Sequence, residues 1–310
     1  MMQKALEIID EVKKAVVGKD AVVSKMLMVM LAQGHILLED IPGVGKTTLA
    51  LAFSKAMALD YRRIQFTPDV MPTDVTGFSV YNKATGKLEY KPGAALCNLF
   101  LADEINRTSS KTQAALLEVM EEGRITVDGV AQETPKPYTV IATQNPVGSA
   151  GTQLLPESQM DRFMVCLAMG YPKLEDEVEI LRRKQGGDPL DRVRKVVDAD
   201  GILAMQREVD NVYLADALYD YIAHLTAATR KEPLIRLGAS PRGSIALTRM
   251  AQAAAYLSGR DYVIPRDVQL VFQDVIAHRI VLSPQAKMGD VSVPSLLEKI
   301  LNRVHAPAVK

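Results

Sequence analysis

The chain has 310 residues with 37 basic and 37 acidic side chains, so its formal net charge is zero. Hydrophobic residues make up 48% and charged residues 24%, a globular composition that excludes a disordered or collagen-like chain. The balanced charge argues against a protein that mainly coats nucleic acid, because neutralising phosphates requires a surplus of Lys and Arg. The length indicates about two domains.

The N-terminal segment lacks the pattern of a signal peptide. It carries Glu7, Asp10 and Glu11 where such a peptide needs an apolar stretch. No stretch approaches the roughly 18 apolar residues that cross a bilayer. The two cysteines, Cys97 and Cys166, are too few for a disulfide framework and lack metal-ligand spacing. We therefore expect a cytoplasmic protein with reduced thiols.

The first half of the chain alternates strand-length apolar runs with segments of helical periodicity. Strands are predicted at 35–39, 62–67, 98–103 and 139–143, and helices at 47–59 and 111–122. This alternation predicts an α/β fold, with a parallel sheet covered by helices on both faces.

Two hairpins are predicted within this half. The first spans 77–93 and turns at Thr85-Gly86. The second spans 124–134 and contains Asp128-Gly129, a strong two-residue turn signal. The first hairpin interrupts a strand-to-helix crossover, so we expect it to be an insert in the core.

The second half shows helical periodicity and no strand-like alternation. Helices are predicted at 174–184, 199–208, 214–229, 244–258, 265–278 and 293–304. The Gly-Gly-Asp-Pro cluster at 186–189 breaks the pattern as a linker does. We therefore predict an α/β core at 1–172, a linker at 173–198 and an all-helical domain at 199–310.

A phosphate-binding loop is predicted between the first strand and its helix. Its glycines let backbone N–H groups turn towards phosphates, and the helix start adds a positive dipole. Lys46 would reach the β and γ phosphates of ATP, and Thr47 would bind Mg²⁺. The residues expected to contact the nucleotide here are Pro42, Gly43, Val44, Gly45, Lys46, Thr47 and Thr48. The strict pattern has glycine at the position of Asp40, and the alternative interpretation is an ordinary Gly-rich turn.

Polar residues follow two of the predicted apolar strands. Asp103-Glu104 closes one strand, where Asp103 would hold Mg²⁺ and Glu104 would polarise the attacking water. Asn145 follows another strand and would also face the γ-phosphate. Taken alone, the acidic pair could cap a helix, and Asn145-Pro146 could be a turn.

Ordered motifs along the chain resemble the MoxR family of AAA+ ATPases. They are LLEDIPGVGKTTLA, RIQFTPDVMPTDVTG, LFLADEINRTSSKTQAALLEVMEEG, ATQNP, LPESQMDRF and LGASPRGSIAL. The resemblance extends from Val17-Gly18 to about 279 and implies a P-loop NTPase core with an all-α C-terminal lid. Asp40 is tolerated in this family, whose loop commonly reads EDxPGxGKT.

The resemblance implies roles that composition and spacing do not supply. Asn145 is similar to the sensor 1 residue, and Val17-Gly18 to the segment that passes the adenine. Arg162 resembles the arginine finger that a neighbouring subunit points at the γ-phosphate. Arg242 resembles the sensor 2 arginine of the lid. Because the lid carries Arg242 and the core carries Lys46, hydrolysis would loosen the lid from the core. Without the family, both arginines would be read as surface or ion-pairing residues.

Further segments keep two interpretations open. The 77–93 hairpin resembles the helix-2 insert and 124–134 the hairpin before sensor 1, which either approach a pore or client or stabilise the ring. Arg107 is either a ring-interface contact or a helix-entry residue. His278-Arg279 is expected to pack in the lid.

The resemblance implies a homo-oligomeric, hexameric ring that hydrolyses ATP with Mg²⁺ to remodel, assemble or mature protein complexes. The partner implied is a protein client, in some cases with a von Willebrand A domain. The alternative is a helicase-like AAA+ nucleic-acid motor, against which stand the zero net charge and the lack of a DNA-binding motif after the lid. A GTPase is excluded because the only Asn-Lys pair, in 82–85, lacks the required Asp.

Overall fold

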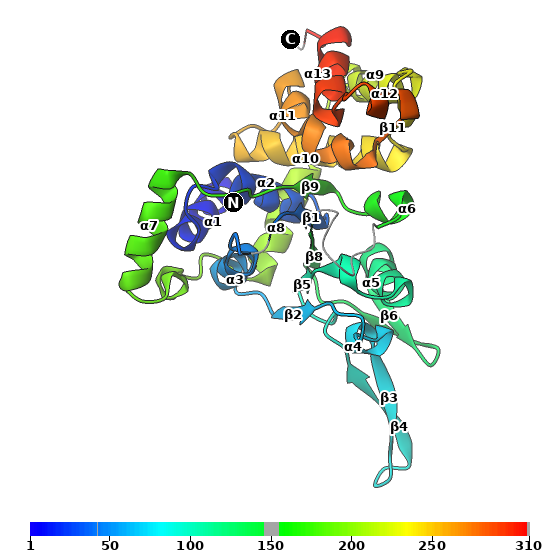
Figure 1. Ribbon diagram of the computed structural model, residues 1–310. Coiled ribbons are helices and arrows are strands. Elements are labelled where there is room, and N and C mark those ends of the chain that lie inside the picture. Colours follow the sequence, from blue (N-terminus) through cyan, green and yellow to red (C-terminus); the bar gives the residue numbers. More distant parts are fainter. Residues whose placement is uncertain (42, 146–154, 309–310) are drawn as a thin grey trace.

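The computed structural model describes residues 1–41, 43–145 and 155–308 (Figure 1). Within these residues, a parallel five-stranded sheet has the strand order β2-β5-β8-β1-β9. Its strands are β1 (Ile36–Glu39), β2 (Tyr61–Gln65), β5 (Leu99–Asp103), β8 (Thr139–Gln144) and β9 (Val165–Leu167). The predicted parallel sheet is confirmed, and β9 is a strand that the sequence pattern did not indicate.

Alternation along the strands divides the core into two layers. In β1, Ile36 and Leu38 join one buried apolar cluster, whereas Leu37 joins the other. Successive strand residues point to opposite faces, so a sheet buried on both sides needs this uninterrupted apolar run. One face is covered by α1 (Met2–Ala15), α2 (Asp20–Leu31) and α3 (Lys46–Met57), and the other by α5 (Ser110–Glu122).

Both predicted hairpins are confirmed. The strands β3 (Gly77–Asn82) and β4 (Lys87–Pro92) pair antiparallel after α4 (Pro72–Thr76), and their hairpin extends away from the core (Figure 1). The strands β6 (Arg124–Val127) and β7 (Val130–Glu133) form the second hairpin. Its two turn residues both have positive φ, 50° for Asp128 and 78° for Gly129, as a tight two-residue turn requires.

The C-terminal part is helical, as expected. After the short α6 (Glu157–Met160), its helices are α7 (Leu174–Gln185), α8 (Ala199–Asp210), α9 (Asp216–Lys231), α10 (Pro241–Leu257), α11 (Pro265–Ile276), α12 (Pro284–Met288) and α13 (Val293–Arg303). Two strands not predicted, β10 (Ile235–Leu237) and β11 (Val281–Leu282), pair antiparallel among them. They are too short to produce a recognisable alternation.

The helical region packs directly on the core. One continuous apolar cluster contains residues of α1, α2 and the sheet together with residues of α8 to α11 and α13. The predicted linker at 173–198 contains α7, a full helix with no buried residue of its own. The division at 1–172, 173–198 and 199–310 stays a prediction. In the described part of the chain, no helix combines the length and apolarity that crossing a membrane would demand.

Candidate nucleotide site

The phosphate loop connects β1 to α3 at the carboxyl edge of the sheet. Gly43 has φ +85° and Gly45 φ +94°, and nothing lies within 4 Å of where a Cβ would stand on either residue. Gly45 caps the start of α3, whose first turn contains Lys46, Thr47 and Thr48. This open glycine cradle at a helix N-terminus suits phosphate oxygens. Pro42, which is also expected to contact the nucleotide, lies outside the described residues.

Lys46 is a buried cation among carboxylates. The residue is only 8% exposed, and its Nζ donates to the carbonyl oxygen of Asp40 at 2.9 Å. Burial lowers the pKa of Lys46, and the nearby charges of Asp40, Asp103 and Glu104 act in the opposite direction. The loop lysine and the predicted acidic pair therefore meet at one edge of the sheet.

Asp103 ends β5 and carries two strong polar partners. Its Oδ1 accepts from Thr143 Oγ1 at 2.6 Å, and its Oδ2 accepts from Arg63 Nη2 at 2.6 Å. Carboxylate and hydroxyl oxygens such as those of Asp103 and Thr47 are the hard ligands that Mg²⁺ prefers. No group of three or more His, Cys, Asp or Glu side chains in the described residues could hold a metal alone. This donor set fits Mg²⁺, which proteins usually bind through one or two side chains and the substrate phosphates.

Glu104 is held in place by three neighbours. Its backbone has φ +58°, in the left-handed region, and its N–H donates to Thr143 Oγ1 at 2.8 Å. Its Oε1 accepts from Asn145 Nδ2 at 3.0 Å and its Oε2 from Arg107 Nη1 at 2.7 Å. Burial would raise the pKa of Glu104, but the hydrogen bonds from Arg107 and Asn145 and the charge of Arg107 bring it below its ordinary value. The carboxylate is therefore ionised at neutral pH and can accept a proton.

The segment predicted to pass the adenine lies between α1 and α2. Val17 is half-buried, and Gly18 is exposed with φ +71°. The next residue, Lys19, donates to main-chain carbonyls that follow β9, and the carboxylate of Asp40 accepts from N–H groups in the same stretch. Val17 and Gly18 are therefore linked to the phosphate loop through the exit of β9.

The two predicted arginines lie together, away from Lys46. Arg162 Nη2 pairs with Glu121 Oε2 at 3.2 Å, and Arg242 pairs with the other oxygen of Glu121. Both arginines line a cavity of about 330 Å³ that also includes Gly34 and His35. These two residues precede β1, so the cavity lies at the amino edge of the sheet, opposite the phosphate loop.

The length of β1 sets the distance between this cavity and the phosphate loop. Gly34 and Asp40 are six residues apart, and an extended chain rises about 3.3 Å per residue, which gives roughly 20 Å. Arg162 is thus remote from the loop of its own chain, as a finger that acts on a neighbour must be. The expectation that hydrolysis loosens the lid from the core through Arg242 and Lys46 of one chain does not agree with this placement.

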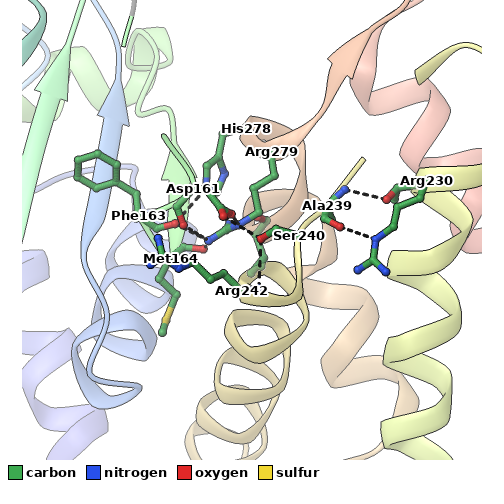
Figure 2. A network of polar contacts seen from close by, with 11 residues as sticks. Asp161, Phe163, Met164, Arg230, Ala239, Ser240, Arg242, His278 and Arg279 are labelled. Atoms are coloured by element: carbon green, nitrogen blue, oxygen red, sulfur yellow. Dashed lines mark hydrogen bonds and ion pairs between the residues drawn. The ribbon is translucent and has the colours of Figure 1, made fainter. Parts of the chain in front are cut away.

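The turn that carries Arg162 is anchored to the helical region (Figure 2). Asp161 Oδ1 accepts from Arg279 Nε at 2.8 Å, and its Oδ2 accepts from Ser240 Oγ at 2.8 Å. Arg279 is 6% exposed and also donates to the carbonyl of Phe163 at 2.7 Å. The expectation that Arg279 packs in the lid is therefore too narrow, because it also holds the core segment that leads into β9.

Comparison with known proteins agrees with this geometry. Residues 35–165 match the family described as ATPase family associated with various cellular activities (AAA), and residues 227–300 match the AAA lid domain. Chaperone MoxR1 of Mycobacterium tuberculosis is 38% identical over 308 residues, covering 96% of this chain and 81% of that protein. The chain belongs to the MoxR family of AAA+ ATPases.

Two further proteins support this MoxR-family membership. YeaC, an uncharacterized protein of Bacillus subtilis, is 46% identical over 96% of this chain and 93% of its own length. A crystal structure from Cytophaga hutchinsonii, of a protein assigned as an ATPase, is 39% identical with a TM-score of 0.92. It covers 99% of this chain and 96% of its own.

The family motifs did not reveal several side chains of the site. Thr143 links Asp103 to Glu104, and Arg63 occupies the second oxygen of Asp103. Arg107 bonds Glu104, a contact that neither of its two predicted roles includes, and the choice between ring interface and helix entry stays open. A threonine two residues before the strand-end Asn145 was the available signal for Thr143. For Arg63 there was none, because its partner depends on the pairing of β2 with β5.

Proposed function

We propose that this MoxR-family protein binds ATP with Mg²⁺ at the carboxyl edge of its sheet and hydrolyses the γ-phosphate. The observation that carries the proposal is the convergence of Lys46, Asp103 and Glu104 beside an open glycine cradle. In the proposed complex, Gly43 to Thr48 hold the phosphates and Val17-Gly18 hold the adenine. Pro42 belongs to the same loop by sequence.

The metal would be held by Thr47 and Asp103. When bound, Mg²⁺ neutralises phosphate charge, which is the chemistry that this reaction needs from it. Lys46 neutralises a further part of that charge, since its ammonium has three N–H donors and its bond to the carbonyl of Asp40 uses only one of them. Because Lys46 is already desolvated, its interaction with phosphate is stronger than that of a solvent-exposed lysine.

Glu104 and Asn145 are proposed to orient the attacking water. The lowered pKa of Glu104 keeps it ionised, and the amide of Asn145 fixes one carboxylate oxygen. An ionised carboxylate can accept a hydrogen bond from water and align its lone pair with the γ-phosphorus. Arg107 restrains the other oxygen, so the carboxylate has a single orientation.

Arg162 and Arg242 are proposed to act on the ATP of a neighbouring subunit. The support is their location at the sheet edge opposite their own Lys46, together with their shared partner Glu121. A closed ring, hexameric by family resemblance, would bring this edge of one copy to the phosphate loop of the next. A cation aimed at the γ-phosphate is worth roughly 10³ to 10⁵ in rate in phosphoryl-transfer enzymes.

The work driven by hydrolysis is proposed to be chaperone-like remodelling, assembly or maturation of a protein client in the cytoplasm. The support is the similarity to the protein named Chaperone MoxR1. A partner with a von Willebrand A domain is part of the proposal by family resemblance. The zero net charge favours a protein client over nucleic acid.

Mixing two inactive variants tests the shared site. Glu104→Gln keeps the arginine finger and loses water activation, while Arg162→Ala keeps the loop and loses the finger. Mixed under conditions of subunit exchange, some interfaces pair an intact Arg162 with an intact Glu104, and ATP turnover is expected to return. Exchange is followed separately with fluorescent labels. No recovery despite exchange would contradict action between subunits.

A further inference from the structure

Asp40 is a buried carboxylate at the position where the strict phosphate-loop pattern has glycine. The residue is 6% exposed and follows β1. Its Oδ1 accepts from the N–H of Ile41 at 2.9 Å. Its Oδ2 accepts from the N–H of Gly170 at 2.7 Å and also from the N–H of Met169. Three main-chain donors thus satisfy a charge that would otherwise be costly to bury.

Lys19 binds the same stretch of backbone from its carbonyl side. Its Nζ donates to the carbonyl oxygens of Met169 at 2.6 Å, Gly170 at 3.1 Å and Tyr171 at 3.0 Å. We call residues 169–171 the exit segment, because the chain leaves β9 there towards α7 (Figure 1). The carboxylate of Asp40 therefore binds N–H groups of the exit segment, and the ammonium of Lys19 binds its C=O groups.

The exit segment joins two parts of the proposed nucleotide site. On one side, the carbonyl of Asp40 accepts from Lys46 Nζ, so Asp40 is continuous with the phosphate loop. On the other side, Lys19 directly follows Gly18 and precedes α2. Charge-assisted hydrogen bonds are roughly twice as strong as neutral ones, so this connection is stiff. A glycine at position 40 would make none of the hydrogen bonds that the carboxylate of Asp40 accepts.

We propose that Asp40 and Lys19 are positioning residues that fix the distance between the phosphate loop and the segment Val17-Gly18. This distance lets the protein recognise the base and the phosphates of one ATP molecule together. The inference rests on the proposed function, in which Val17-Gly18 hold the adenine. It extends that function by assigning base recognition to two side chains that touch neither base nor phosphate.

Tripolyphosphate separates this role from a purely structural one, because it has the phosphates of ATP and no base. Calorimetry on the full chain measures the affinity of ATP and of tripolyphosphate for the wild type and for Lys19→Met. We expect Lys19→Met to weaken ATP binding about tenfold, or about 1.4 kcal/mol. Tripolyphosphate binding is expected to change less than about twofold, with kcat at saturating ATP retained, since the mutation leaves the reacting groups in place. Equal losses for both ligands, or no loss for either, would overturn the proposal.

Matched controls lie close to Lys19 in the sequence. Lys13→Met and Asp20→Asn remove the members of an exposed ion pair at 3.2 Å beside the same helices, and both are expected to bind like the wild type. Asp40→Asn is combined with Lys19→Met in a double-mutant cycle on ATP affinity. Since both side chains act through the exit segment, the double variant is expected to lose less than the product of the two single losses. Independent losses would contradict the shared connection. A wild type that binds no ATP would instead contradict the proposed function.

Discussion

Replacing Thr143 by valine tests whether the two acidic residues of the site are held by one hydroxyl group. Thr143 lies in β8 and is fully buried. Its Oγ1 donates to Asp103 Oδ1 at 2.6 Å and accepts from the N–H of Glu104 at 2.8 Å. Valine has nearly the same shape without the hydroxyl, so Thr143→Val removes both hydrogen bonds and leaves no large cavity.

The expected loss of stability follows from these two contacts. A hydrogen bond to a charged group contributes about 1.5 to 3 kcal/mol, and an unsatisfied buried donor costs about 1 to 3 kcal/mol. Because the valine methyl group retains the packing and the neighbourhood can relax, we expect the free energy of unfolding to fall by about 3 kcal/mol. Glu104 also loses the bond that restrains its left-handed backbone, φ +58°. Misplacement of a catalytic group by about 1 Å can cost about 100-fold, so we expect kcat for ATP to fall by 10- to 100-fold.

Urea denaturation and steady-state ATP hydrolysis measure these effects. Thr143→Ser keeps the hydroxyl and is expected to recover most of kcat. Thr139→Val, at the other end of the same buried strand, is the control for introducing valine into β8. KM for ATP is expected to stay within about threefold, because the phosphate loop is untouched. A Thr143→Val protein with wild-type kcat would refute the idea that this hydroxyl holds Glu104.

Three further predictions concern named side chains. Lys46→Ala is expected to abolish ATP binding while Glu104→Gln keeps binding and loses turnover, as measured by calorimetry and phosphate release; wild-type affinity in the lysine variant would remove the loop from the site. Arg107→Met is expected to raise the pKa of Glu104 towards its ordinary value, so the acid limb of the pH profile of kcat/KM moves to higher pH, and an unmoved limb would contradict this. The stability gained from that lowered pKa is present above the unfolded pKa and is lost as the pH falls through the folded one. Arg279→Met leaves Asp161 without its buried cation and is expected to cost about 3 to 5 kcal/mol in urea unfolding, whereas a change below about 1 kcal/mol would show that the network contributes little.

The fold was predictable where elements are long or fully buried. The run at 36–38 is apolar at every residue because β1 is covered on both faces, and the Asp128-Gly129 turn identified its hairpin. The pairing of Ile235 with Leu282 was not predictable, because two- and three-residue strands carry no period. Their pairing depends on how α9 and α11 each pack against α10, which is a tertiary effect.

Some side chains of the candidate site were predictable from the sequence and others were not. Lys46, Asp103 and Glu104 were predictable, because phosphate binding requires particular residue types at particular positions of a strand and loop. The ion pair of Arg63 with Asp103 was not, since it depends on the register that places β2 beside β5. Glu121 was also missed as the shared partner of two arginines, because that contact requires the lid to dock where it does.

Under the proposed function, the two edges of the sheet explain why one chain alone would form an incomplete site. Strands of a parallel sheet present the phosphate loop at their carboxyl ends, while α5 returns to their amino ends and brings Glu121 there. Arg162 is fixed to the same end through Asp161 and Arg279, and Arg242 follows Ser240 in the same network. No side chain spans the roughly 20 Å between these edges. A lid movement would therefore carry both arginines together, and under the proposed function it would change the ATP site of the neighbouring subunit.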